Sequence, residues 1–202
     1  MKKLLIIVTV ACLVTVVFAQ VQTLPSASEE MEDKTPKSLL GIEFGKTVED
    51  VANIKNASRM QDGSAVEGYV DPKKAFRKFT GKNAFGRINI FGSITTHKVF
   101  RFRWQSEDFA KEAQEEEAVS EFRRTCDVIA KKFGGEFQDV PIKSKSTIWD
   151  RKAVATFGLL KVEMLLECRK MKMIVTNLLL EAKAKKELEA LKAAEGDGSD
   201  AL

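Results

Sequence analysis

The hairpin that decides the fold lies in residues 161–175, which read KVEMLLECRKMKMIV. Apolar side chains recur at every second position on both sides of Arg169-Lys170: Val162, Met164, Leu166 and Cys168 before it, then Met171, Met173 and Val175 after it. A period of two is typical of a strand with one buried face and one face in water. The stretch therefore predicts two antiparallel strands joined by a turn at Arg169-Lys170.

A second hairpin is predicted upstream, where residues 85–91 and 94–104 flank Gly92-Ser93. Alternation in its second strand places the aromatic side chains on one face and the basic side chains, with His97, on the other. These are Phe100, Phe102 and Trp104 against Arg101 and Arg103. Shorter strands are expected at 39–44, 66–70, 74–79, 136–140, 147–152 and 153–158.

Two helices are predicted between these strands. A short helix at 48–54 has Thr47 as its cap, and Asp50 follows three residues later. A long helix begins at Ser106 and ends at Gly134, because its apolar residues step by three or four and its acidic residues fall largely on the other side.

A third helix is predicted at 179–194. Its narrow apolar stripe consists of Leu180, Ala184, Leu188 and Leu191, and we expect it to pack on its own domain. Runs of hairpin strands separated by helices are typical of an α+β fold. We expect a mostly antiparallel sheet built from hairpins, with one short and one long helix packed on it and a C-terminal tail helix.

The composition is that of a globular chain: of 202 residues, 44% are hydrophobic and 31% charged. We expect five consecutive parts along it. They are a signal peptide at 1–19, a flexible linker at 20–38, a single α+β domain at 39–178, the C-terminal helix at 179–194 and a disordered tail at 195–202.

Residues 1–19 have the pattern of a secretory signal: Lys2 and Lys3, then an uncharged apolar run that ends in Val17-Phe18-Ala19. Retention as a membrane anchor stays open, although the uncharged run spans only roughly 24 Å as a helix. Cleavage would leave an exported chain, periplasmic or secreted, without a stable membrane span. Since two lysines and no acid would be removed, the formal net charge would fall from +4 to +2. We expect no nucleic-acid partner, because a near-neutral domain does not attract phosphate backbones over long distances.

Export also bears on the cysteines, since Cys12 belongs to the signal while Cys126 and Cys168 lie in the domain. A disulfide between Cys126 and Cys168 is possible in an oxidising compartment. It would stabilise the fold by about 4 kcal/mol in the chain-entropy interpretation. Two separate buried thiols are the open alternative.

The candidate motifs for phosphate binding and for a histidine metal site are incomplete in this chain. Gly45-Lys46-Thr47 lies between a predicted strand and helix, but a phosphate-binding loop needs a glycine where Leu40 stands. His97 is the only histidine, which excludes multi-histidine metal sites, and we expect it on the surface. We therefore predict no catalytic, cofactor-binding or metal-binding residues, and no cofactor.

The segment 40–51, LGIEFGKTVEDV, resembles the start of small exported bacterial domains of unknown function. In those domains a first strand ends in a Gly-Ile-x-Phe-Gly turn and a short helix follows. Phe133-Gly134-Gly135 is similar to an aromatic-glycine pair that recurs later in them. The resemblance implies an exported α+β domain and assigns no catalytic residue.

These patterns favour an exported, non-catalytic bacterial protein that offers a sheet face or edge to a protein or envelope partner. Two alternatives stay open. One is a hydrolase of envelope polymers that uses scattered carboxylates. The other is a structural protein that self-associates through the helix at 179–194. The oligomeric state does not follow from the sequence.

Overall fold

The computed structural model describes residues 31–32, 34–70, 86–106, 115–142, 150–167 and 169–196. Six predicted features lie wholly or in large part outside these residues: the signal at 1–19, the linker at 20–38, the strands at 74–79 and 147–152, Cys168, and the tail at 195–202. Contacts along the chain separate residues 1–34 from residues 35–202. The fold described below is that of the second unit.

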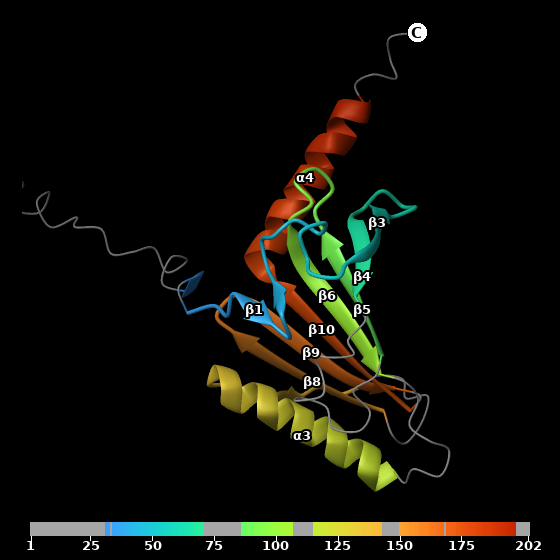
Figure 1. Ribbon diagram of the computed structural model, residues 1–202. Helices are drawn as coiled ribbons and strands as arrows, with labels where there is room; N and C mark the ends of the chain where they lie inside the picture. Colours follow the sequence, from blue (N-terminus) through green and yellow to red (C-terminus); the bar gives the residue numbers. More distant parts are fainter. Residues whose placement is uncertain are drawn as a thin grey trace, which may run out of the picture. The chain divides into compact units, whose positions relative to one another are not determined.

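Within the described residues, the domain is built on an eight-stranded antiparallel sheet with the order β3-β4-β5-β6-β10-β9-β8-β7 (Figure 1). The strands are β3 (Lys55–Arg59), β4 (Val66–Val70), β5 (Gly86–Gly92), β6 (Val99–Ser106), β7 (Gln138–Asp139), β8 (Arg151–Phe157), β9 (Leu160–Glu167) and β10 (Lys170–Asn177). The short pair β1 (Ser38–Leu39) and β2 (Ile42–Glu43) precedes them. Helices α3 (Glu115–Phe133) and α4 (Leu178–Gly196) pack on the sheet. The predicted α+β fold class is confirmed.

The two predicted hairpins meet in the middle of the sheet. β5 pairs with β6, β9 pairs with β10, and β6 pairs with β10, all antiparallel. Glu167 lies opposite Lys170, so Lys170 already belongs to β10 and not to the turn in which it was predicted. Arg169 has a φ of 67°, which is the conformation that a two-residue hairpin turn favours.

The first hairpin closes through residues 93–98, a longer connection than the predicted two residues. Ile94 is buried in this loop. Its apolar side chain was therefore mistaken for the start of the second strand. The His97 amide donates to the Ser93 carbonyl at 3.1 Å and closes the turn. Glycine is required at Gly92, because a Cβ there would lie 2.4 Å from the His97 carbonyl oxygen.

A β-bulge in β6 changes the face that one aromatic side chain occupies. The register between β5 and β6 shifts between Phe91 and Gly92, which leaves Phe100 as an extra residue. Phe102 and Trp104 are buried together on one face, as predicted, whereas Phe100 packs against the opposite face, below α4. The prediction that all three aromatic side chains share a face was wrong, because a bulge reverses the alternation behind it.

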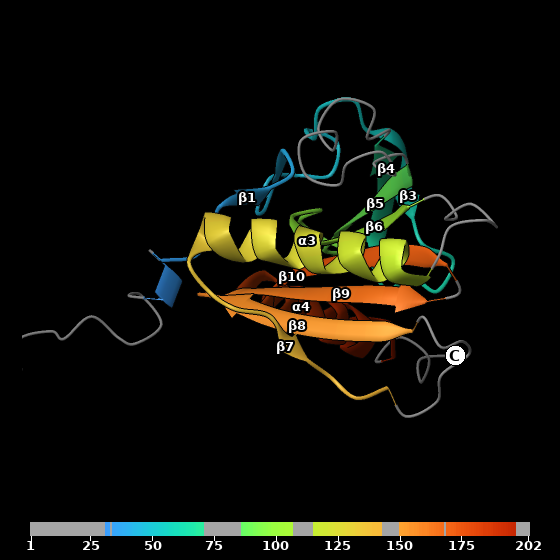
Figure 2. The same ribbon diagram turned by 90° about the horizontal axis from the view of Figure 1, so that it is seen from below.

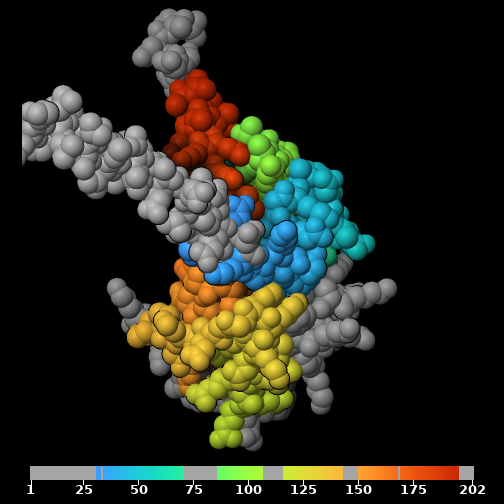
Figure 3. Space-filling model, turned by 90° about the vertical axis from the view of Figure 1, so that its left-hand side faces the viewer, coloured from blue at the N-terminus to red at the C-terminus, as the bar shows by residue number. Residues whose placement is uncertain are grey.

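The two faces of the sheet are covered differently (Figure 2). On the face that we call the inner face, α3 packs on β8 and β9, and residues 39–54 lie beside α3 (Figure 3). The buried side of α3 consists of Ala118, Phe122, Cys126 and Ile129. On the other face, which we call the open face, α4 packs on β6 and β10. The core therefore lies between the sheet, α3 and the N-terminal segment.

The ends of both helices follow from local residues. Gly134 ends α3 with a φ of 73°, and its amide donates to the Ala130 carbonyl at 2.8 Å. The side chain of Asn177 caps α4 by accepting from the Leu180 amide at 3.1 Å. Ser106, the predicted start of the long helix, is instead the last residue of β6. Of the helices that the structure describes, none has the length and apolar character to cross a membrane.

The N-terminal segment differs from its prediction in two places. Residues 39–44 contain the hairpin β1–β2 rather than one strand, because Leu40 and Gly41 both adopt positive φ. Residues 48–54 form successive turns rather than a helix, although the Thr47 hydroxyl donates a hydrogen bond to the Asp50 carboxylate. A segment this short gains too few helical hydrogen bonds to offset the cost of starting a helix.

Candidate binding surface

The open face carries aromatic and basic side chains on neighbouring strands. Its positions on β4, β5 and β6 are Glu67, Tyr69, Arg87, Asn89, Phe91, Arg101, Arg103 and Gln105. The register places Tyr69 opposite Asn89 and Asn89 opposite Arg103, so these three side chains form one row across the strands. Asn89 donates a side-chain hydrogen bond to Glu67.

Two exposed arginines in this region lie over aromatic rings. The guanidinium carbon of Arg87 is 4.1 Å from the ring centroid of Tyr69, and that of Arg103 is 5.8 Å from the ring centroid of Phe91. Neither arginine forms an ion pair with any residue in the described part of the chain. When a guanidinium lies above a ring, the N–H groups along its edge can still donate hydrogen bonds to a carboxylate. We call these four residues the arginine strip.

The other half of the open face, on β8, β9 and β10, neutralises its own charges. Lys152 and Lys161 contact Glu163 at 3.2 and 2.5 Å, and Lys172 contacts Glu167 at 2.8 Å. Burial raises the pKa of Glu163, but hydrogen bonds and charge from the two lysines outweigh burial and hold the pKa below its ordinary value. Unpaired positive charge is thus a property of the arginine strip and not of the whole face.

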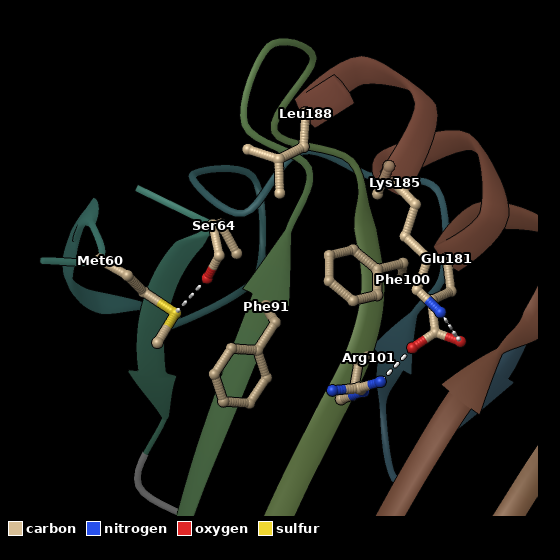
Figure 4. A pocket seen from close by; sticks show the side chains of 10 residues that line it. Met60, Ser64, Phe91, Phe100, Arg101, Glu181, Lys185 and Leu188 are labelled. Atoms are coloured by element: carbon tan, nitrogen blue, oxygen red, sulfur yellow. Dashed lines mark hydrogen bonds and ion pairs between the residues drawn. The ribbon is translucent and has the colours of Figure 1, made fainter. Parts of the chain in front are cut away.

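A cavity of about 280 Å³ adjoins the arginine strip, between α4, the turn that precedes β4, and the strands β5 and β6 (Figure 4). Its apolar lining consists of Met60, Ala65, Phe91, Phe100, Ala184 and Leu188. The ion pair between Arg101 and Glu181 lies at one end. Phe91 lines the cavity and also carries Arg103 on its ring, so the cavity and the arginine strip form one continuous surface.

One wall of the cavity is a tight turn between β3 and β4. The Met60 amide donates to the Ala65 carbonyl at 2.9 Å. The carboxylate of Asp62 accepts from the amide and hydroxyl of Ser64 at 2.9 and 2.7 Å, and these bonds lower the pKa of Asp62. The turn therefore holds the Met60 side chain beside the cavity, as Figure 4 shows.

The opposite wall is α4, which polar contacts hold in place. The Glu187 carboxylate accepts from the amides of Thr95 and Thr96, both at 3.3 Å, and from the Thr96 hydroxyl at 3.0 Å. Burial raises the pKa of Glu187, but hydrogen bonds from Ser93, Thr96 and Thr95 outweigh burial, and the net pKa is lowered. Glu187 is thus ionised at neutral pH and ties α4 to the loop between β5 and β6.

The residues that the sequence analysis weighed for chemistry lie apart from this surface. His97 is partly exposed in the loop 93–98, with its Nδ1 2.7 Å from a Glu49 carboxylate oxygen. Gly45 adopts a φ of 83° in a turn, as expected for a glycine there. Among the residues described, no group of three or more His, Cys, Asp or Glu could hold a metal ion.

The predicted disulfide stays a prediction, because Cys168 lies outside the described residues. Cys126 is buried on the inner side of α3. Burial, with the nearby charges of Asp127 and Asp139, raises the pKa of the Cys126 thiol to about 12. A thiol with that pKa is protonated at neutral pH and is a poor nucleophile.

The arginine strip was not predicted from the sequence. Within the predicted strand 94–104, basic and aromatic residues were expected on opposite faces. The aromatic partners Tyr69 and Phe91 come from the neighbouring strands β4 and β5. Alternation within each strand shows which residues share a face of that strand. Only the pairing of β4, β5 and β6 shows that these faces form one surface.

Comparison with known proteins provides no relative. No protein-family model matches the chain, and neither a curated protein nor a solved structure is detectably similar to it.

Proposed function

We propose that this is an exported, non-catalytic protein of the bacterial cell envelope, whose open face binds a partner protein through the arginine strip and the adjoining cavity. The proposal of export is supported by the signal pattern at residues 1–19, with its basic start, apolar run and small-residue end.

One observation carries the proposal of binding: Arg87 and Arg103 are exposed over aromatic rings beside an apolar cavity. Arginine and aromatic residues are the types enriched at protein interfaces, where they supply a large share of the binding free energy. Holding a guanidinium over a ring also reduces the conformational freedom that it would lose on binding.

The carboxylates support binding over hydrolysis. A hydrolase of envelope polymers that works through paired acids needs one carboxyl group with a raised pKa. In the described part of the chain, hydrogen bonds lower the pKa of Asp62, Glu163 and Glu187, which is the opposite of what such an acid requires. The carboxylate that lines the cavity, Glu181, is paired with Arg101.

The test is capture of the partner in the cells that produce the protein. The full chain with a C-terminal tag is crosslinked in place, and the captured proteins are identified by mass spectrometry. We expect Arg103→Glu to remove a specific protein from the captured set. Arg123→Glu is the matched control, because Arg123 is exposed on α3, away from the open face.

Equal capture by the wild type and the Arg103→Glu variant would contradict the proposed interface. Location is tested in the same cells by fractionation and N-terminal sequencing, where a mature chain that begins at Gln20 is the expected result. A chain that still begins at Met1 in the cytosol would contradict export.

A further inference from the structure

The cavity and the two arginines follow one another across the open face, on β5 and its neighbours β4 and β6. Phe91 lines the cavity, Asn89 lies opposite Arg103, and Arg87 comes two residues further along the strand. Side chains on one face of a strand recur every two residues, which corresponds to about 7 Å. The Arg103 guanidinium lies over Phe91 at the edge of the cavity, and the Arg87 guanidinium lies over Tyr69, opposite Asn89, about one such interval further from the cavity.

We infer that the partner segment is an extended acidic peptide that places one bulky apolar side chain in the cavity and carboxylates at the second and fourth residues beyond it, over Arg103 and Arg87. This inference rests on the proposed function and names the chemistry of its partner. An extended peptide repeats its side chains at the same interval as β5, so its alternate residues match the three features.

The size of the cavity favours a single side chain as its occupant. At about 280 Å³ it lies at the lower limit of pockets that enclose small molecules, which are roughly 300 Å³ or more. Its lining is mainly apolar, with Met60 and Leu188 as flexible side chains at its walls. Such walls adapt to an aliphatic or aromatic side chain.

The charges next to the cavity indicate which side chains of the partner would lie beyond it. Arg101 is paired with Glu181, whereas Arg87 and Arg103 have aromatic rings as partners and point no N–H group at a carboxylate of the described residues. Arginine binds a carboxylate through two parallel hydrogen bonds, which gives direction as well as affinity. Two arginines therefore favour two acidic side chains at defined positions.

The same charges disfavour a nucleic acid on this surface. Glu67 and Glu181 lie among the arginines, so a chain with a phosphate at every residue would meet carboxylates as well. The chain as a whole has a formal net charge of only +4. Strands of bases need a continuous positive groove, which this face lacks.

The edges of the sheet are less suited to an extended partner. On one side, β3 has a register shift between Lys55 and Ser58, and Asn56 has a φ of 51°. Bulges of this kind prevent a further strand from pairing. On the other side, β7 is only two residues long. A peptide that lies across the open face avoids both edges.

The inference is tested by fluorescence anisotropy with the full chain and the labelled peptide Ser-Gly-Phe-Ser-Glu-Ser-Glu-Gly-Ser. Its reverse, Ser-Gly-Glu-Ser-Glu-Ser-Phe-Gly-Ser, covers the opposite direction along β5. We expect one of the two to bind at least about tenfold more tightly than the same peptide with Gln for Glu or with Ser for Phe. Moving each Glu by one position should weaken binding by a similar factor, since the acids would then face away from the sheet.

Variants of the protein locate the binding. Arg103→Gln and Arg87→Gln should each weaken binding of the better peptide by about tenfold or more, and Arg123→Gln should leave it unchanged. Leu188→Asp and Leu188→Phe should both remove the preference for Phe over Ser. The second variant keeps an apolar side chain on α4, so a loss there reflects filling of the cavity and not loosening of the helix.

The outcomes separate this inference from the proposed function. Binding that is equally tight when the two Glu residues are moved would overturn the inference. Oligothymidylate serves as the nucleic-acid probe, and tighter binding of it than of either peptide would also overturn the inference. Loss of cellular capture in Arg103→Glu without peptide binding would leave the proposed interface standing and reject the acidic extended peptide. Failure of both experiments would reject the interface as well.

Discussion

The two helices, α3 and α4, have the same length of 19 residues but are held to the sheet in different ways. α3 buries Ala118, Phe122, Cys126 and Ile129 in the main core. Of the side chains of α4, only Ala184 is classed as buried, at 7% exposed, while the carboxylates of Glu181 and Glu187 bind groups on β6 and the loop before it. Apolar burial thus fixes α3, and polar contacts position α4.

The difference has a consequence for binding. A wall of the candidate cavity belongs to α4, the helix that contributes little to the core. Elements with few buried apolar contacts open at lower free energy than the core. The shape of the cavity is therefore adjustable without unfolding the domain.

Truncation of an inward side chain should affect the two helices unequally. Phe122→Ala in α3 should lower the free energy of unfolding by about 3–5 kcal/mol, because it leaves a cavity in the core. Leu188→Ala in α4 should cost about 1 kcal/mol, because Leu188 is only partly buried. Urea unfolding followed by circular dichroism measures both, and equal losses would contradict the contrast.

Removal of the hydrogen bonds between Glu187 and the loop 93–98 should destabilise α4 and leave α3 unchanged. Glu187→Ala deletes the acceptor of three hydrogen bonds and should cost about 1 kcal/mol, since the group is partly screened by water. Amide hydrogen exchange should then become roughly fivefold faster in α4 and stay unchanged in α3. Arg123→Ala, on the solvent side of α3, serves as the control.

Lowering the pH should weaken the same hydrogen bonds of Glu187. The folded-state pKa of Glu187 is lowered from an ordinary value of 4.5, so its contribution is fully present above that pH and is lost as the pH falls through the lowered value. We expect hydrogen exchange in α4, corrected for intrinsic rates, to rise relative to α3 as the pH falls below about 4.5. The Glu187→Gln variant should lack this dependence, and a wild type with the same flat profile would contradict it.

Removal of an exposed basic side chain should affect the two helices alike. Lys185→Ala removes a contact of 3.6 Å to Glu181 in α4, and Arg124→Ala removes one of 2.9 Å to Glu121 in α3. Exposed pairs three or four residues apart contribute about 0.2–0.5 kcal/mol. Thermal unfolding should shift slightly and equally in both variants, and a much larger shift in Lys185→Ala would show that surface charge also positions α4.

The parts of the fold that the sequence predicted are those with a local period. Strand β4 lies at the predicted residues 66–70, and both hairpins form. The end of α3 at Gly134 and the inward side chains Phe122 and Ile129 also agree with prediction. Each of these depends on neighbours within a few residues, where alternation, helical spacing and glycine conformation are informative.

The errors arose where a local pattern competed with the surrounding fold. The loop 93–98 resembled a strand because Ile94 is apolar, but Ile94 is buried in a turn. Residues 48–54 had the cap of a helix without enough length to form one. The bulge at Phe100 has no signature in the alternation and reverses it.

By itself, the sequence determined the antiparallel hairpins, the α+β class and the apolar side of α3, because each follows from the periodicity of a single segment. Only the tertiary structure decided that β6 lies beside β10, that Phe100 faces α4, and that Arg87 and Arg103 lie over Tyr69 and Phe91. Those contacts join strands through their register, and register between separate segments is set by how the whole core packs.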